Sequence, residues 1–215
     1  MTPPDAHRAT AWQVQSLLMG YPDEQLLGRF PLLRAATATL PAPLGAPLRA
    51  FLDHAAATPL TELAADYVAT FDHRKRFSPY LTYFAYGDTR KRGMALLRFK
   101  QTYRAAGLEL GDDELPDHLA VVLEFAASGN ATAGERLLLE HRAGLELMRL
   151  GLRESRSPWA HVLASVSATL PPLGGEEHEA VARLAAAGPP EEEVGLAPFT
   201  APTIAPDRLF PGGRR

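Results

Sequence analysis

The residues with the clearest capacity for chemistry lie between Glu109 and Phe125. This stretch holds six carboxylates and one histidine, and it contains no lysine or arginine. A carboxylate next to a histidine, as at Asp117 and His118, can exchange protons with a ligand or bind it through hydrogen bonds. The preceding segment from His73 to Arg104 has nine lysines and arginines against one acid, Asp88. A basic segment therefore leads directly into an acidic one.

Most of the acids in this stretch can be explained as the start of a helix. Proline costs little in a first helical turn, and carboxylates near a helix N-terminus are favoured by the helix dipole. The prediction is thus that Asp112, Asp113, Glu114 and Asp117 cap and begin a helix. His118 does not fit this explanation, because a protonated histidine gains nothing from a helix N-terminus. We interpret His118 as a neutral donor or acceptor beside Asp117, at the mouth of a groove.

The motifs of common catalytic and metal sites are missing from the sequence. There is no cysteine, and no Gly-x-Ser-x-Gly element supplies a serine nucleophile. The seven histidines form neither a His-Glu-x-x-His pair nor a Glu-x-x-His pair. Phosphate-binding Walker and Gly-x-Gly-x-x-Gly sequences are missing too. We therefore predict a protein that is not an enzyme and that has no metal or cofactor site.

Length and composition indicate a protein with a single core. With 215 residues, 46% of them apolar, the chain can bury most of its surface in one domain. Its formal charge of −3 gives no overall affinity for nucleic acid or anionic lipid. The N-terminus lacks the features of a signal peptide, and no run of 18 apolar residues occurs. We expect a cytoplasmic protein that does not insert into a membrane.

Apolar residues at helical spacing predict an all-α fold, a single-domain bundle of many helices. The predicted helices cover Arg8 to Met19, a segment capped by Asp23, Leu48 to Ala56, Leu60 to Phe71, Asp88 to Ala106, the stretch after Glu114, Ala131 to Met148, a segment begun by Ser157-Pro158 and ended by Pro171-Pro172, and Glu176 to Ala187.

Two further predictions concern a loop and the buried side of one helix. The segment from Leu40 to Pro47 contains three prolines and a glycine and is predicted to be a loop. In the helix that Asp88 begins and Gly107 ends, Met94, Leu97 and Tyr103 are expected to face inward.

The segment from Pro79 to Tyr86 is unusually aromatic. Its composition suits a strand as well as a helical turn, but no neighbouring strand is predicted, which favours a helix or an extended loop. Two interpretations of the aromatic residues Tyr80, Tyr83, Phe84 and Tyr86 fit equally well. They either pack in the core or form the wall of a groove that receives an apolar peptide helix.

The basic residues between Arg90 and Arg104 also allow two interpretations. Such residues commonly form a solvated helix face. Alternatively, the chain is a helical regulatory or nucleic-acid-binding module that uses this face against phosphates, although it has no nucleic-acid-binding motif.

The C-terminal part differs in composition from the rest. From Gly188 onward proline, glycine, glutamate and threonine dominate, and few apolar residues are available to offset the entropy of ordering. We therefore divide the chain into a helical domain, 1–187, and a proline-rich, disordered or loosely docked tail, 188–215.

Four motifs in series resemble those of a known family. They are Tyr67-Val68-Ala69-Thr70-Phe71-Asp72, Gly87-Asp88-Thr89-Arg90-Lys91-Arg92-Gly93, Tyr103-Arg104-Ala105-Ala106-Gly107-Leu108 and Glu114-Leu115-Pro116-Asp117-His118-Leu119. In this order they are similar to the respiratory nitrate reductase assembly chaperones of the NarJ type, which belong to the TorD-like redox-enzyme chaperones. The resemblance covers residues 10–170 and leaves out the tail.

The resemblance implies an all-α, non-catalytic, cytoplasmic chaperone. Such proteins bind the N-terminal leader helix of the catalytic (alpha) subunit of nitrate reductase and hold that subunit until molybdenum cofactor is inserted, before it docks to membrane partners. The cofactor insertion machinery is an indirect partner. The resemblance places Pro116, Asp117 and His118, with Glu114, at the peptide-binding groove, and it makes the region of Tyr80, Tyr83 and Phe84 a neighbouring wall. No nucleic acid is implied as a partner.

Overall fold

The described residues of the computed structural model, 6–87, 89–111 and 114–187, form an all-α protein. Eleven α-helices, one 3-10 turn and one π-helical turn occur among them, and no strand does. None of the helices in these ranges is both long and apolar enough to cross a membrane. The elements are α1 (Ala6–Met19), α2 (Glu24–Ala38), α3 (Ala42–Ala57), α4 (Leu60–Phe71), η1 (Lys75–Phe77), α5 (Tyr83–Tyr86), α6 (Arg90–Ala105), α7 (Leu119–Glu124), η2 (Phe125–Gly129), α8 (Ala131–Glu140), α9 (Arg142–Glu154), α10 (Trp159–Ala168) and α11 (Gly175–Ala187).

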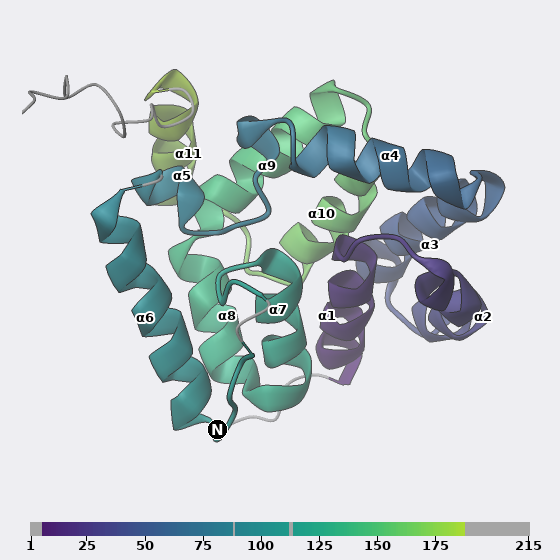
Figure 1. The fold of residues 1–215 in the computed structure, drawn as a ribbon, viewed down its shortest axis with the longest axis horizontal. Coiled ribbons are helices and arrows are strands. Elements are labelled where there is room, and N and C mark those ends of the chain that lie inside the picture. The colour runs from purple at the N-terminus through teal and green to yellow at the C-terminus, as the bar shows by residue number, and fades with distance from the viewer. Residues whose placement is uncertain (1–5, 88, 112–113, 188–215) are drawn as a thin grey trace, which may run out of the picture.

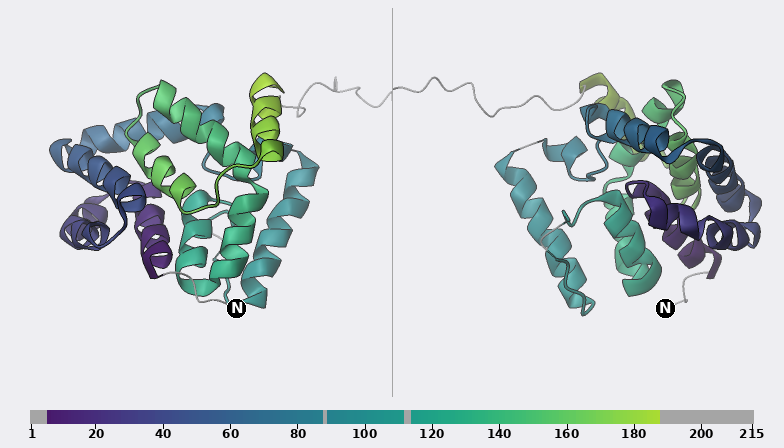
Figure 2. Two further views of the ribbon diagram at one scale, coloured as in Figure 1. Left: turned by 180° about the vertical axis from the view of Figure 1, so that it is seen from behind. Right: turned by 45° about the vertical axis from the view of Figure 1, so that its right-hand side comes forward.

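The helices pack around α1 and α10, which lie near the middle of the molecule (Figure 1). Helix α1 packs on α7, and α10 packs on α3 and α9. Figures 1 and 2 place α6 at one edge of the molecule and α2 and α3 at the opposite edge. The largest fully buried side chains include Trp12, Phe51, Phe99 and Trp159, so the core is continuous across these helices.

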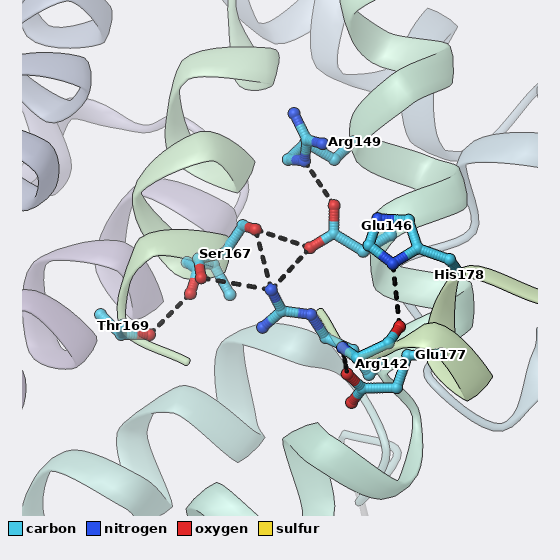
Figure 3. A network of polar contacts seen from close by, with 9 residues as sticks. Arg142, Glu146, Arg149, Ser167, Thr169, Glu177 and His178 are labelled. Atoms are coloured by element: carbon cyan, nitrogen blue, oxygen red, sulfur yellow. Dashed lines mark hydrogen bonds and ion pairs between the residues drawn. The ribbon is translucent and has the colours of Figure 1, made fainter. Parts of the chain in front are cut away.

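A buried polar network joins α9 to α10 (Figure 3). Glu146 accepts hydrogen bonds from Ser167 Oγ at 2.6 Å and from Arg149 Nε at 2.6 Å, and its Oε1 lies 3.0 Å from Arg142 Nη2. Both Arg142 and Glu146 are buried. A buried charge is tolerated when it is paired and hydrogen-bonded, so this network fixes how the two helices meet.

Several helix boundaries predicted from the sequence are confirmed. Asp23 is the N-cap of α2, with its Oδ1 accepting a hydrogen bond from Leu26 N at 2.7 Å. Helix α4 begins directly after Pro59, and Gly107 follows α6 with a φ of 77°. Only glycine adopts such a φ without strain. Asp88 and the tail from 188 onward lie outside the described residues.

The predicted loop from Leu40 to Pro47 is wrong. Pro41 is the N-cap residue of α3, and Pro43 lies in its first turn. Backbone N–H groups there have no intrahelical acceptor, so proline loses no hydrogen bond. Only Pro47 stands inside the helix.

The predicted single helix from Ala131 to Met148 is also wrong, because α8 and α9 are separated at His141, whose φ is −113°. The His141 ring packs edge-on against Phe99 of α6, with centroids 5.3 Å apart. The two glycines of this segment permit close contacts. A Cβ on Gly134 would lie 2.5 Å from Ala126, and one on Gly144 would lie 2.9 Å from Phe84.

Helix α6 is rotated relative to the prediction. Tyr103 is buried as expected, and Phe99 is buried beside it. Met94 and Leu97 face outward, with 70% and 51% of their surface exposed. Met94 and Leu97 lie on the side of the helix away from Tyr103, which is buried and donates through Oη to Pro116 O at 2.6 Å.

Candidate functional site

The segment Pro79–Leu81 pairs with the segment 117–119, although 35 or more residues separate them. Leu81 N donates to Asp117 O at 2.9 Å, and Leu119 N donates to Pro79 O at 2.8 Å. These two bonds form an isolated antiparallel bridge between Tyr80 and His118. The bridge holds residues 117 and 118 outside the helix, so α7 begins at Leu119. The predicted helix start at Glu114 to Asp117 is therefore wrong. Asp112 and Asp113 lie outside the described residues.

Asp117 is completely buried and anchors this bridge. Its Oδ2 accepts hydrogen bonds from Thr82 Oγ1 at 2.5 Å and from Thr82 N at 3.2 Å, and Arg92 Nη2 lies 3.8 Å away. The carboxylate therefore cannot reach a ligand at the surface. It holds Tyr80 and His118 in place, and Arg92, whose guanidinium lies 5.4 Å from the Tyr80 ring centroid, completes the cluster.

His118 is the N-cap residue of α7. Its Nδ1 accepts a hydrogen bond from Ala120 N at 3.2 Å, so the neutral ring carries its proton on Nε2. Burial lowers the pKa of His118, and the nearby Asp117 carboxylate opposes this effect. The ring stands edge-on to Tyr80, with centroids 5.3 Å apart. Because Nδ1 is used as an acceptor, Nε2–H is the hydrogen-bond donor of the neutral ring.

A hollow of ≈280 Å³ opens beside this cluster. Two of the side chains that line it are large, apolar and exposed, with Tyr21 57% and Leu115 41% exposed. Tyr67 forms part of the wall, and its ring stands edge-on to Tyr21 with centroids 5.6 Å apart. The lining residues are Gly20, Tyr21, Tyr67, Tyr80, Glu114, Leu115, His118 and Ala120. We refer to this site as the Tyr21–Leu115 hollow.

Four of the seven residues predicted for the site do not line this hollow. Pro116 and Asp117 are buried. Tyr83 and Phe84 are buried as well, and Phe84 packs where Gly144 of α9 leaves room for it. Glu114, Tyr80 and His118 do line the hollow.

Sequence reasoning missed Tyr21 and Leu115 as site residues. Tyr21 stands between Gly20 and Pro22 directly after α1, and an aromatic residue between two helix-ending residues is a signal that could have found it. Leu115 is the one apolar residue next to Glu114 in the acidic stretch. Their proximity depends on the packing of α1 against α7, which sequence does not reveal.

A second hollow, of ≈240 Å³, is lined in part by α7 and by the loop after α6. Leu108, 42% exposed, is its most accessible apolar residue. The lining residues are Tyr103, Leu108, Glu109, Leu110, Val121, Glu124, Phe125 and Ser128. It has none of the residues of the Tyr80–His118 cluster, so the two hollows can be distinguished by mutation.

The fold and the hollow together define an all-α protein with a surface site walled by aromatic and apolar side chains. In the ranges that the structure describes, no group of three or more histidines and acids is placed to hold a metal ion.

Comparison with known proteins identifies the family. The family described as nitrate reductase delta subunit matches residues 37–165, and the chain belongs to this family. It is 30% identical over 171 residues to the probable nitrate reductase molybdenum cofactor assembly chaperone NarJ of Bacillus subtilis, which covers 79% of this chain and 93% of that protein. The resemblance seen in the four sequence motifs is thereby confirmed.

Two further relatives are similar over smaller shares of their length. The nitrate reductase molybdenum cofactor assembly chaperone NarJ of Escherichia coli K12 is 32% identical over 149 residues, covering 66% of this chain and 63% of that protein. The nitrate reductase-like protein NarX of Mycobacterium tuberculosis H37Rv is 42% identical over 158 residues, which are 74% of this chain. The match spans 24% of NarX.

Proposed function

We propose that this protein is a chaperone for the assembly of a nitrate reductase. It binds the N-terminal leader helix of the catalytic subunit and keeps that subunit ready for insertion of molybdenum cofactor, before docking at the membrane. Membership of the nitrate reductase delta subunit family supports this proposal, as do the names of the relatives in B. subtilis and E. coli. In this proposal the chain acts in the cytoplasm, and the molybdenum cofactor is delivered to the bound subunit by separate insertion machinery.

The observation that carries the proposal is the Tyr21–Leu115 hollow. An amphipathic helix binds by laying its apolar face into an apolar groove, and its affinity comes mainly from the area buried there. Tyr21 and Leu115 already expose large apolar surfaces at the hollow, which a bound helix would cover. Tyrosine also supplies a hydroxyl at the edge of such an interface.

Charge at the hollow comes from Glu114, which is exposed. A carboxylate at the rim attracts basic residues of a leader helix and increases the rate of association more than the final affinity. Nε2–H of His118 donates to a carbonyl or side-chain oxygen of the peptide. Asp117, Pro116, Tyr83 and Phe84 contribute indirectly, by supporting the wall.

Leu115→Ala should weaken binding of the leader peptide about tenfold, because truncation removes apolar area that the peptide buries. The test is calorimetric titration with a synthetic peptide of the cognate catalytic subunit's N-terminus. Leu108→Ala is the matched control, since Leu108 is 42% exposed and lines the second hollow instead. Equal losses in both variants, or a loss only in Leu108→Ala, would contradict the assignment of the site.

Binding of the same peptide should weaken as the pH falls below about 6.5, the ordinary pKa of histidine. Because burial lowers the pKa of His118, the ring stays neutral at pH 7 and protonates only below its usual range. Protonation removes the Nδ1 acceptor for Ala120 N–H and places a cation at the N-terminus of α7, where the helix dipole opposes it. The titration is repeated between pH 8 and 5.

His118→Asn separates this effect from other ionisations. Asparagine is a good N-cap residue, so α7 keeps its cap while the titrating ring is lost. The charged or titratable groups around the ring are Tyr80, Asp117, Arg92 and Glu114, and all remain in the variant. The variant should bind with an affinity that changes less with pH than that of the parent. A parallel decline in both proteins would rule out His118 as the group responsible.

A further inference from the structure

Helix α6 carries a concentrated positive charge that acids among the described residues neutralise only in part. It contains six lysines and arginines and no acid. Arg90, Lys91 and Arg104 are exposed, and in the described ranges none of them has an ion-pair partner. On most helix surfaces acidic residues are interspersed among the basic ones and pair with them. Because α6 has no acid, its exposed cations are available to an anionic partner.

Two exposed apolar side chains lie among these cations. At 100° per residue, Met94 and Leu97 fall on the same side of α6 as Arg90 and Arg104. They are 70% and 51% exposed. The core is contacted by the other side of the helix, through Phe99 and Tyr103. We call the outward residues Arg90, Met94, Leu97, Arg98 and Arg104 the α6 face; it lies on the helix at the edge of the molecule (Figure 2).

A hollow of ≈270 Å³ adjoins this face, between α6 and α8. Arg98 of α6 and Arg136 of α8 both line it. Glu140 is the acid paired with both, with its Oε1 2.8 Å from Arg98 Nη2 and 3.8 Å from Arg136 Nε. One carboxylate is therefore shared by two guanidinium groups, which leaves a net charge of +1. A second carboxylate can bind there.

We propose that the α6 face and the adjoining hollow form a docking surface for an acidic protein segment, such as a helix whose glutamates and aspartates flank a short apolar patch. Arginine and methionine are enriched in protein interfaces, and an arginine beside an apolar contact is a frequent source of binding energy. Carboxylates of the partner would meet Arg90 and Arg104, and one would enter the hollow at Arg98 and Arg136. The apolar patch would cover Met94 and Leu97.

Membrane lipid and nucleic acid fit this surface less well. A helix that lies on a membrane separates its apolar and basic residues onto opposite sides, whereas here both types share one side. Nucleic-acid phosphates would use the arginines but leave Met94 and Leu97 without a role. The α6 face shares no residue with the Tyr21–Leu115 hollow, so it can be tested independently of leader binding.

The test uses a fluorescent peptide of about 18 residues, long enough to form a helix, in which glutamates flank a strip of leucines; a permuted peptide of the same composition is the comparison. Fluorescence anisotropy should show binding to the full-length protein that is weakened about tenfold or more by Arg90→Glu/Arg104→Glu. The control Arg29→Glu/Arg153→Glu makes the same change of charge at exposed arginines of α2 and α9 and should alter the affinity less than about twofold. Met94→Ser/Leu97→Ser should also weaken binding, whereas Leu32→Ser, at a residue 69% exposed on α2, should not.

The proposal is overturned if the acidic peptide does not bind, if the permuted peptide binds equally well, or if the control reversal has the same effect as the reversal on α6. It is also overturned if vesicles of phosphatidylglycerol and phosphatidylcholine, or a short DNA duplex, bind tighter than the peptide and are insensitive to Met94→Ser/Leu97→Ser.

Discussion

Trp159→Ala is expected to lower the free energy of unfolding by about 3–5 kcal/mol, the range seen when a large buried aromatic side chain is truncated. Trp159 is 1% exposed, and its ring lies 5.5 Å from Phe51, 5.6 Å from Tyr67 and 5.5 Å from Phe71, measured between centroids. Its Nε1 also donates to Leu18 O at 3.3 Å. One side chain thus joins α10 to α1, α3 and α4. Urea denaturation followed by circular dichroism measures the change.

Trp159→Phe is the control for this prediction. Phenylalanine keeps most of the apolar volume and loses the hydrogen bond to Leu18 O, so the loss should be clearly smaller than with alanine. Surface and tolerant positions typically change the free energy of unfolding by less than about 1 kcal/mol. A change this small for Trp159→Ala would show that the aromatic cluster does not hold these helices together.

Asp117→Ala should lower the free energy of unfolding by about 3 kcal/mol, because removing the buried carboxylate leaves the Thr82 donors without their acceptor and takes a counter-charge from Arg92. The bridge between Tyr80 and His118 would loosen as a result, so binding at the Tyr21–Leu115 hollow should weaken as well. Denaturation and peptide titration on the same variant measure the two effects.

Glu114→Ala is the matched control. Glu114 is an acid three residues away that is exposed, and its removal should change the stability by less than about 0.5 kcal/mol. A double-mutant cycle with Thr82→Val then gives the coupling energy of the Asp117–Thr82 pair. Equal stability of Asp117→Ala and Glu114→Ala would contradict the structural role given to Asp117.

Local signals in the sequence predicted much of the fold. The spacing of apolar residues and the capping chemistry of Asp23, Pro59 and Gly107 act within a few residues, and the structure confirms them. Proline misled the assignment at α3, because its effect depends on its place in the helix: Pro41 and Pro43 stand at the start, where they cost little.

The site was predicted less completely, because it is formed by contacts between distant segments. The bridge between Tyr80 and His118 determines where α7 begins. No residue within the acidic stretch indicates that this bridge forms. The same bridge buries Asp117, which from sequence resembled a helix-starting acid. His118 was singled out because it does not fit helix-start chemistry, and the structure shows its Nδ1 accepting from Ala120 N. The exposed position of Met94 and Leu97 could have been predicted from helical spacing, because at 100° per residue both lie on the side of α6 away from the buried Tyr103.

The most direct measurement locates the bound leader helix. A leader peptide with a photoreactive benzoylphenylalanine on its apolar face is cross-linked to the full-length protein, and the adducts are mapped by mass spectrometry. Adducts are expected at Tyr21, Tyr67 and Leu115, which line the hollow. Adducts confined to Leu108, Val121 and Phe125 would instead place the peptide in the second hollow and contradict it.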